Sequence, residues 1–281
     1  MIARSLVVMA SMLVGIASPV RGQEVLTLAR ADGQVLRLKP YAPAGTCRGI
    51  AILSHGAGGS EDGLAYLAEA MARNGYLAAV IGHQESGRRA LRRRIIGSGI
   101  RGGLTGLVGD TTAYAGRLMD VAAARQWASA RCPGKESVLL GHSMGAATVM
   151  IEAGARNSFG VRGVNGFDAY VALSPQGAGL IFPANAWSEL RKPVLTITGT
   201  RDTELGGSSW ETRKEPFANM PPGCKWLAVI AGATHMDLGG RGTSRRAQEL
   251  AARMVHTFLD GARAGNCAAP PYEPGIDVQV K

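Results

Sequence analysis

The chain has few of the features that mark membrane, fibrous or nucleotide-binding proteins. Beyond its first 22 residues it contains no run of about 18 uninterrupted apolar residues, the length that a membrane-spanning helix needs. Its 39 glycines follow no three-residue period and 46% of its residues are hydrophobic, which excludes a collagen-like or disordered chain. Neither glycine-rich phosphate-binding motif, G-x-x-x-x-G-K-[ST] or G-x-G-x-x-G, is present. What remains is a 281-residue globular chain, long enough for a sizeable core.

Cysteine is scarce as well. The four cysteines form no C-x-x-C pair, so a zinc ribbon or a thioredoxin-like site has no support. Their even number predicts two disulfides in an oxidising compartment, whereas four buried thiols are the alternative in a reducing one. The sequence alone allows three pairings. His235 and Asp237 have the spacing of two metal ligands, but no third partner follows, and we predict neither a metal nor a cofactor.

The first 22 residues have the pattern of a secretory leader. Arg4 precedes an apolar stretch from Leu6 to Ala17, which is short for a membrane span and typical of a signal peptide. Small residues stand three and one positions before a cut that leaves Gln23 at the new N-terminus. We predict a signal peptide over residues 1–22 and a periplasmic or secreted protein, with an uncleaved anchor as the alternative. Removal of the leader's two arginines lowers the net charge from +10 to +8.

Apolar runs rich in Val, Ile and Leu alternate with helical patterns along the rest of the chain, which is typical of a parallel α/β sheet. The predicted strands are 24–30, 34–41, 49–54, 77–81, 137–141, 169–173, 194–198 and 226–230, and the predicted helices are 62–73, 111–130, 144–155 and 243–260. No interior linker separates two cores. Residues 23–281 are therefore predicted to form one domain with a Pro-rich surface tail from about residue 266.

The sequence Gly141–Gly145 reads G-H-S-M-G between an apolar strand and a helical pattern. Strand, G-x-S-x-G and helix in this order are the context of a nucleophile elbow. The glycines are needed because the strained serine backbone leaves no room for a Cβ two residues away. The pattern predicts Ser143 as a nucleophile and the Met144 N–H, at the helix N-terminus, as an oxyanion donor. A plain strand–helix turn is the alternative.

A second glycine-rich turn, H-G-A-G-G, directly follows the predicted strand 49–54. A turn of this type allows a backbone amide to approach a developing oxyanion, and Ala57 is the residue best placed to offer it. We interpret His55 as a structural residue that holds this turn. His83 ends the next strand and is interpreted as a floor or supporting residue of the pocket.

The remaining members of a catalytic triad are expected after later strands. Asp202 follows the predicted strand 194–198, with Glu204 as the alternate acid. Asp168 precedes a strand and therefore lies at the wrong end of the sheet. His235 follows the last predicted strand and is the expected base. The chain order of Ser143, Asp202 and His235 is the one expected of an α/β-hydrolase.

These motifs together resemble the α/β-hydrolases. The resembling segments are SHGAGGSEDGLAYLAEAMARNGYLAAVIGH, GHSMG, TGTRD and GATHMD. They are similar to the branch of predicted dienelactone hydrolases and platelet-activating-factor acetylhydrolase-like esterases, near the cutinase-like polyester hydrolases. The resemblance implies a mostly parallel sheet of about eight strands with helices on both faces. Dienelactone hydrolases typically use a cysteine nucleophile, so Ser143 departs from that pattern.

The resemblance also implies a pairing for the cysteines. In the family's strand order, Cys47 and Cys132 precede neighbouring parallel strands and meet at the bottom of the sheet. Cys224 precedes the last strand and Cys267 follows the last helix, where the secreted polyester hydrolases often carry a disulfide. The implied disulfides are therefore Cys47–Cys132 and Cys224–Cys267.

An arginine-rich segment, residues 86–109, is predicted to be a flexible loop at the catalytic end of the sheet. It carries Arg88, Arg89, Arg92, Arg93, Arg94 and Arg101 and no acidic residue. One interpretation is a lid or rim that attracts anionic substrates or makes weak contact with anionic surfaces. The other is an ordinary solvated loop. No nucleic-acid-binding motif accompanies it, so we predict no nucleic-acid partner.

The predicted function is that of an exported, monomeric serine esterase that acts on small-molecule or acyl esters. Gln176, Phe182 and Trp187 are candidates for the substrate pocket, and core packing is the alternative for the two aromatic residues. An acyltransferase or peptidase with the same triad is the alternative enzyme. A non-catalytic envelope-binding protein on a hydrolase scaffold is the alternative from another class.

Overall fold

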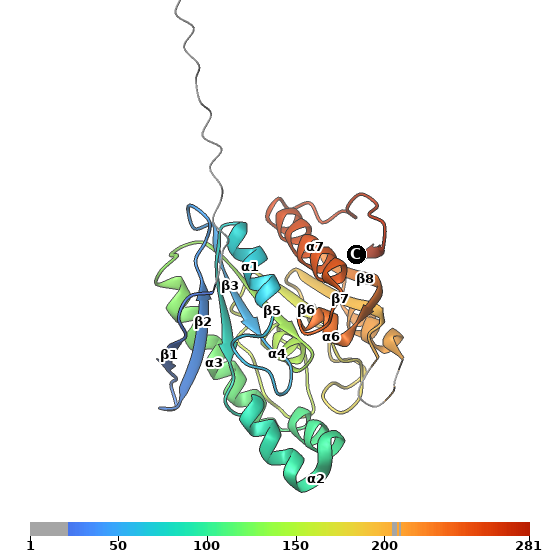
Figure 1. The fold of residues 1–281 in the computed structure, drawn as a ribbon. Helices are drawn as coiled ribbons and strands as arrows, with labels where there is room; N and C mark the ends of the chain where they lie inside the picture. The colour runs from blue at the N-terminus through green and yellow to red at the C-terminus, as the bar shows by residue number, and fades with distance from the viewer. Residues whose placement is uncertain (1–21, 204–206, 208) are drawn as a thin grey trace, which may run out of the picture.

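The computed structural model describes residues 22–203, 207 and 209–281, and it arranges nine strands in one sheet (Figure 1). The strands are β1 (Leu26–Ala29), β2 (Val35–Tyr41), β3 (Gly49–Ser54), β4 (Tyr76–Gly82), β5 (Glu136–His142), β6 (Ala169–Leu173), β7 (Val194–Arg201), β8 (Lys225–Thr234) and β9 (Ile276–Val280). Their order is β1-β2-β4-β3-β5-β6-β7-β8-β9. The six central strands from β4 to β8 are parallel, and the pairs β1–β2, β2–β4 and β8–β9 are antiparallel. This is the α/β-hydrolase fold.

Helices cover both faces of the sheet, as predicted. They are α1 (Ala65–Arg73), α2 (Arg88–Val108), α3 (Thr111–Ser129), α4 (Met144–Glu152), α5 (Glu215–Asn219), α6 (His235–Leu238) and α7 (Arg245–Arg263), with a short 3₁₀ helix η1 (Trp210–Lys214). Apolar residues of α1 and α7 pack on one face, and those of α3 and α4 pack on the other. No helix in the described part of the chain is long and apolar enough to cross a membrane.

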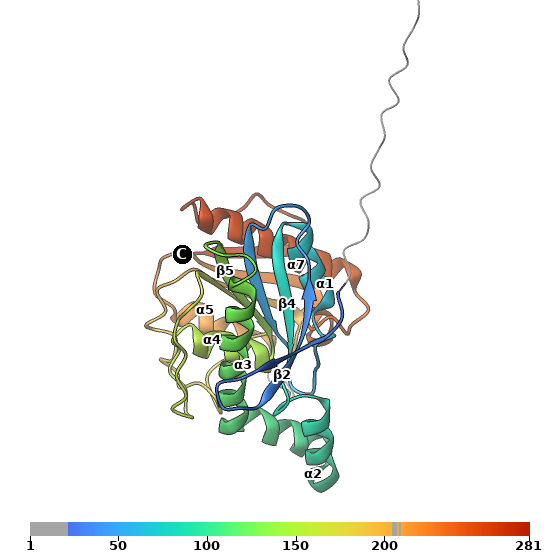
Figure 2. The same cartoon turned by 90° about the vertical axis from the view of Figure 1, so that its left-hand side faces the viewer.

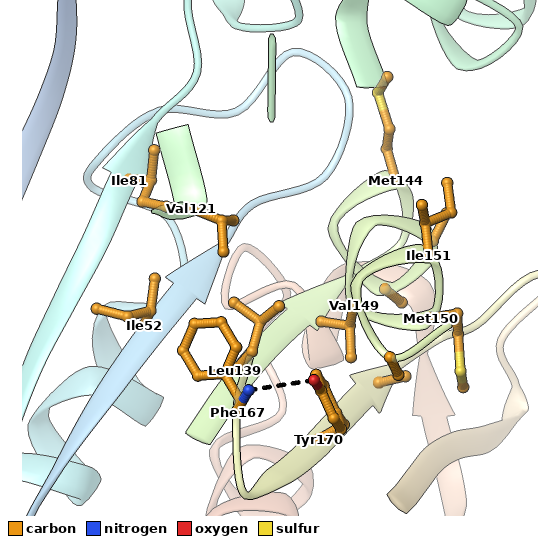
Figure 3. Packing of buried hydrophobic residues seen from close by; sticks show 14 of the residues in the cluster. Ile52, Ile81, Val121, Leu139, Met144, Val149, Met150, Ile151, Phe167 and Tyr170 are labelled. Atoms are coloured by element: carbon orange, nitrogen blue, oxygen red, sulfur yellow. Dashed lines mark hydrogen bonds between the residues drawn. The ribbon is translucent and has the colours of Figure 1, made fainter. Parts of the chain in front are cut away.

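The central strands are buried on both faces because their alternate side chains enter two separate clusters. In β3, Ile50 and Ile52 join the cluster under α3 and α4, whereas Ala51 and Leu53 join the cluster under α1 and α7. This explains the continuous apolar runs in the sequence. Figure 3 shows the first cluster, in which the Phe167 N–H donates a hydrogen bond of 3.2 Å to the Tyr170 hydroxyl. The sheet is therefore a rigid base that carries its polar residues at the strand ends.

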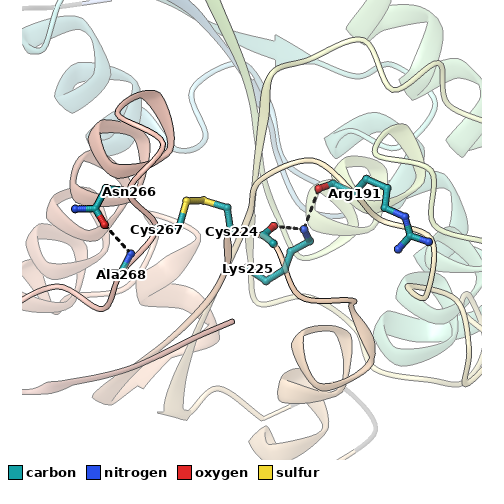
Figure 4. Close-up of a disulfide and its surroundings, with 7 residues drawn as sticks. Arg191, Cys224, Lys225, Asn266, Cys267 and Ala268 are labelled. Carbon is teal, nitrogen blue, oxygen red and sulfur yellow. Dashed lines mark hydrogen bonds between the residues drawn. A yellow bond between two sulfur atoms is a disulfide. The ribbon is translucent and has the colours of Figure 1, made fainter.

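Two disulfides join the cysteines in the pairing that the resemblance implied. Cys47 precedes β3 and bonds to Cys132, which precedes β5, and β3 and β5 are parallel neighbours. Cys224 precedes β8 and bonds to Cys267, beyond the end of α7 (Figure 4). Disulfides persist mainly in oxidising compartments. The predicted leader, residues 1–22, lies outside the described residues except for Gly22.

The arginine-rich segment is helical, so the prediction of a flexible loop over residues 86–109 was wrong. These residues form α2, which bends at Gly99 (φ 69°) and stands out from the body of the molecule (Figure 2). Arg94 donates a hydrogen bond of 3.0 Å to the Gly106 carbonyl, which ties the two halves together. The five glycines of α2 after Arg94 suggested a loop. Glycine, however, lowers the stability of a helix by only about 1 kcal/mol per residue, and here one bend at Gly99 is enough for the helix to continue.

The C-terminal tail contains a ninth strand, one more than the eight predicted. β9 pairs antiparallel with β8 and places Val280 opposite Trp226. Its alternating sequence, Ile-Asp-Val-Gln-Val, fits a half-buried edge strand. The preceding proline-rich segment concealed this short pattern. β9 covers the edge of β8, which would otherwise expose unpaired backbone groups.

Candidate active site

Ser143 lies in a strained turn between β5 and α4. Its backbone has φ 56° and ψ −118°, a left-handed conformation that is rare for residues other than glycine. Its N–H donates a hydrogen bond of 2.9 Å to the Leu173 carbonyl of β6, which holds the turn over the sheet. A Cβ on Gly141 would lie 2.2 Å from the Gly145 carbonyl oxygen. A side chain at Gly141 would therefore clash with the turn, which is the steric reason for the first glycine of a G-x-S-x-G elbow.

Gly145 is required for a second reason, which predicts a measurable defect. A Cβ at this position would lie 2.0 Å from the Ser54 carbonyl oxygen, a backbone atom at the end of β3. We expect Gly145→Ala to lower the free energy of unfolding by about 1–3 kcal/mol through overpacking. The displaced turn should also lower hydrolase activity by about tenfold or more, because a shift of about 1 Å is enough for such losses.

Chemical denaturation and hydrolysis of p-nitrophenyl acetate measure both effects. Gly97→Ala is the matched control, since a Cβ on this α2 glycine meets nothing within 4 Å. The control should be as active as the wild type. Wild-type stability and activity in Gly145→Ala would contradict the close approach of β3 to the elbow.

His235 and Asp202 are joined at the same end of the sheet. Asp202 follows β7, His235 begins α6 directly after β8, and the distance from His235 Nδ1 to Asp202 Oδ1 is 2.8 Å. Asp202 is fully buried, whereas the His235 side chain is 27% exposed. His142, the neighbour of Ser143, packs against His235 in a tilted arrangement with ring centroids 4.5 Å apart, and its Nε2 donates to the His235 carbonyl at 3.0 Å. The structure therefore brings the histidine–aspartate pair to the elbow.

Arg213 is a member of this cluster that the sequence analysis missed. It is 2% exposed, and its Nε lies 2.9 Å from Asp202 Oδ1, the same oxygen that His235 contacts. Its Nη1 donates to the carbonyls of Ser174 and Pro175 at 3.0 and 3.1 Å. No local pattern marks this arginine, because it comes from η1, beyond the loop that follows β7.

The electrostatics keep Asp202 ionised. Burial by itself would raise its pKa, but the hydrogen bond from His235 and the charge of Arg213 hold the pKa below its ordinary value. The other carboxylate oxygen, Oδ2, accepts a hydrogen bond of 3.0 Å from the Thr198 hydroxyl. An ionised aspartate at His235 Nδ1 orients the ring, as the acid of a Ser-His-Asp triad would.

The turn after β3 lies beside Ser143, as the H-G-A-G-G pattern predicted. A Cβ on Gly56 would lie 3.2 Å from the Ser143 Cβ, so the next residue, Ala57, is close to the nucleophile position. Among the described residues, no acceptor pairs with the Ala57 N–H, whereas the N–H of Gly58 donates to Ser86 and that of Gly59 to Gly56. The Met144 N–H is in the first turn of α4, where helix geometry provides no intrahelical partner.

His55 holds this turn, as the sequence suggested. Its Nδ1 lies 2.6 Å from the Gly56 carbonyl oxygen, and its Nε2 accepts a hydrogen bond of 3.2 Å from the His83 N–H. The fully buried Arg117 donates to the His55 carbonyl at 2.8 Å. The backbone that presents Ala57 is therefore fixed by two side chains.

A second serine, histidine and aspartate lie within hydrogen-bond distance beneath that turn. Ser54 Oγ is 2.8 Å from His83 Nε2, and His83 Nδ1 is 2.8 Å from Asp120 Oδ2. These three residues are placed as a triad would be. Ser54 ends β3 and His83 directly follows the neighbouring β4, which the sequence did indicate, but Asp120 comes from the middle of α3 and carries no motif.

The environment of this second set differs from that of Asp202 and His235. Ser54 and Asp120 are fully buried and His83 is 2% exposed. Burial raises the pKa of Asp120 to about 7, although the charge of Arg30 opposes this shift. Burial and the charges of Arg117 and Arg30 hold the pKa of His83 well below its ordinary value. An imidazolium at His83 is therefore unfavourable.

The remaining candidates from the sequence have other environments or lie outside the described residues. Phe182 and Trp187 are fully buried and pack against each other at 5.4 Å between ring centroids, which favours the core alternative over a pocket wall. Gln176 is half-buried, with a buried amide oxygen that has no partner among the described residues. Asp168 accepts hydrogen bonds from Ser137 at the start of β5, at the opposite end of the sheet. Glu204, the alternate acid, lies outside the described residues.

Comparison with known structures supports the same fold. An alpha-beta serine hydrolase homologue from Coxiella burnetii is 17% identical, with 85% of this chain and 100% of that chain covered and a TM-score of 0.59. A dienelactone hydrolase from Anabaena variabilis is 18% identical, with coverages of 86% and 99% and a TM-score of 0.61. A cold-adapted esterase from an Arctic intertidal metagenomic library is 18% identical, with coverages of 82% and 92% and a TM-score of 0.56.

These low identities show a shared fold and leave the substrate open. No curated protein matches the sequence significantly. Residues 45–195, slightly more than half of the chain, match the family model described as serine aminopeptidase, S33. This segment includes the elbow at Ser143 and the turn after β3. The chain belongs to the serine aminopeptidase S33 family of α/β serine hydrolases.

Proposed function

We propose that the protein is an exported esterase that cleaves carboxylic esters through an acyl-enzyme on Ser143. The observation that carries this proposal is the strained backbone of Ser143 at the head of α4, next to the hydrogen-bonded pair of His235 and Asp202. Two structural neighbours, an esterase and a dienelactone hydrolase, agree with ester chemistry. We also propose that the protein belongs to the branch that its motifs resemble, the dienelactone hydrolase and platelet-activating-factor acetylhydrolase-like esterases.

The mechanism follows from the positions of the groups. His235 Nε2 takes the proton of the Ser143 hydroxyl, while Asp202 accepts from Nδ1 and stabilises the imidazolium. Ser143 Oγ then attacks the ester carbonyl, and the N–H groups of Ala57 and Met144 donate to the oxyanion. His235 returns the proton to the leaving alcohol, and a water molecule activated by the same histidine hydrolyses the acyl-enzyme.

Two contrasts support Ser143 over Ser54 as the nucleophile. Ser143 is half-buried in a left-handed turn, whereas Ser54 is fully buried in regular strand geometry and its hydroxyl accepts from Arg117 at 3.1 Å. The pKa of Asp202 is held low, whereas that of Asp120 is raised to about 7. Near pH 7 the acid beside His235 is the better ionised of the two. We assign the Ser54–His83–Asp120 chain to support of the turn that carries Ala57.

Covalent labelling separates these assignments. A fluorophosphonate probe should react with the purified protein, and peptide mapping should find the adduct on Ser143. Ser143→Ala should abolish labelling and lower hydrolysis of p-nitrophenyl acetate by about 10⁴-fold or more. Ser54→Ala should still be labelled. An adduct on Ser54, or loss of labelling in a folded Ser54→Ala variant, would contradict the proposal; absence of any labelling and of ester hydrolysis would refute the enzyme itself.

Aminopeptidase activity is the second candidate, because the matching family is named for it. Both activities share the acyl-enzyme, but a peptidase must protonate an amine leaving group and bind a free N-terminus. Parallel assays with amino-acid p-nitroanilides and with p-nitrophenyl esters distinguish them. Turnover of the anilides at rates comparable to the esters, abolished by Ser143→Ala, would establish the peptidase instead.

Export belongs to the same proposal. The leader pattern in residues 1–22 and the two disulfides support it. Mass spectrometry of the protein from the periplasm or medium should find Gln23 at the N-terminus. An intact leader in the membrane fraction would instead support the anchor.

A further inference from the structure

A polar cleft lies beside the N-terminal end of α2, away from the catalytic residues. Its volume is about 570 Å³, within the usual range of small-molecule sites. Its walls come from four segments: β2 and the residue before it, the turn after β3, the end of β4 and the first turns of α2. Neither Ser143, Asp202 nor His235 lines it.

The acidic residues of this cleft are already paired. Glu61 binds Arg37 at 2.7 Å, and Asp62 binds Lys39 at 2.9 Å. Glu85 binds the buried Arg30 at 2.6 Å. Each carboxylate of the wall therefore has a cationic partner, although Arg30 also binds Asp32 at 2.6 Å and Asp120 at 3.2 Å.

Three further arginines of the cleft come from α2. Arg88, Arg89 and Arg93 line the cleft, and all three are exposed. The described part of the chain places no ion-pair partner on any of them, although the charge of Arg88 helps to lower the pKa of Asp62. Among the lining residues four arginines stand against three carboxylates, so the lining carries an excess of positive charge, concentrated on the α2 side of the cleft. Such an excess in one concave site attracts anions.

We propose that this cleft binds a ligand with two or more phosphate groups. A guanidinium presents paired N–H donors that match phosphate oxygens, so three guanidinium groups suit several phosphate oxygens better than a single carboxylate. Gln34, Ser60 and Gln84 in the same wall supply neutral hydrogen-bonding groups. The phosphate groups belong either to a soluble phosphate ester or to a lipid headgroup, and the chemistry of recognition is the same for both.

The cleft shares one structural element with the candidate active site. Gly59 lines the cleft, and its N–H donates a hydrogen bond of 3.1 Å to the carbonyl of Gly56, which lies against Ser143. The two sites are therefore separated by one tight turn. Binding at the cleft does not require the hydrolase reaction, so the proposal stands independently of the ester chemistry.

Calorimetric titration with inorganic pyrophosphate tests the proposal directly. The cleft variant Arg88→Gln/Arg89→Gln/Arg93→Gln should raise the Kd by about tenfold or more, since it removes three charge-assisted contacts. The control variant Arg162→Gln/Arg191→Gln/Arg245→Gln removes the same charge from exposed arginines that do not line the cleft. It should change the Kd by less than about threefold, because exposed distant charges are screened by salt.

A variant that should bind pyrophosphate more tightly shows that a change in affinity is not caused by misfolding. Glu61→Gln removes a negative charge from the wall and releases Arg37 from its ion pair, so it should tighten pyrophosphate binding. A second arm measures cosedimentation with phosphatidylcholine vesicles that contain phosphatidic acid. Pyrophosphate binding alone supports a soluble ligand, and vesicle binding lost only in the cleft variant supports a headgroup. Equal losses in the cleft and control variants, or no binding of wild type in either arm, would overturn the proposal.

Discussion

Replacing Asp202 by alanine is expected to lower kcat for ester hydrolysis by about 10⁴-fold. The variant loses the acceptor at His235 Nδ1 and leaves the guanidinium of Arg213 buried without its carboxylate. Asp202→Asn should be milder, with a loss of about 10²-fold, because Arg213 and His235 both donate to the position of Oδ1. The amide oxygen is favoured there, and the amide N–H can donate to the Thr198 hydroxyl at the position of Oδ2.

The asparagine variant therefore keeps the orientation of His235 and loses mainly the negative charge that stabilises the imidazolium. Steady-state kinetics with p-nitrophenyl acetate, together with circular dichroism to verify folding, measure the difference. If Asp202→Asn and Asp202→Ala lower kcat by the same factor, Arg213 does not set the orientation of the side chain at position 202. If alanine retains nearly full activity, Asp202 is not the triad acid.

Arg213→Met is expected to lower the free energy of unfolding by about 3–5 kcal/mol, because it leaves Asp202 as a buried carboxylate without its cation. It should also lower kcat by about 10²-fold, since His235 loses a rigidly held partner. Arg263→Met is the matched control: this arginine pairs with Glu136 at the start of β5, at the opposite end of the sheet. The control should lose stability only modestly and keep its activity.

The pH dependence provides a second readout for Arg213. The pKa of Asp202 lies below its ordinary value in the folded protein, so its carboxylate adds stability at pH values above about 4. That stability is lost as the pH falls through the lowered pKa. Without Arg213, burial should raise this pKa, and the midpoint of acid unfolding should move to higher pH. An unchanged midpoint would contradict the role of Arg213 in keeping Asp202 ionised.

Local patterns accounted for the buried central strands and for the residues at their ends. Buried parallel strands are continuous apolar runs, and an elbow needs glycines at two fixed positions, so both leave a signal that can be read along the chain. The loop expected in place of α2 and the missing ninth strand were the two errors about the fold, and neither element leaves a clear pattern in the sequence. The helix α2 carries glycines and arginines without an apolar stripe, and β9 is only five residues long.

The sequence by itself determined the fold class and the placing of Ser143, Asp202 and His235 after buried strands, now β5, β7 and β8, because apolar runs and short motifs leave a pattern along the chain. Only the tertiary structure decided the partners of these residues. Arg213 reaches Asp202 from beyond the next loop, Asp120 reaches His83 from the middle of a helix, and the arginines of α2 join β2 and the turn after β3 in one cleft. Such pairings depend on distance in space and on desolvation, and neither leaves a period or a spacing in the chain.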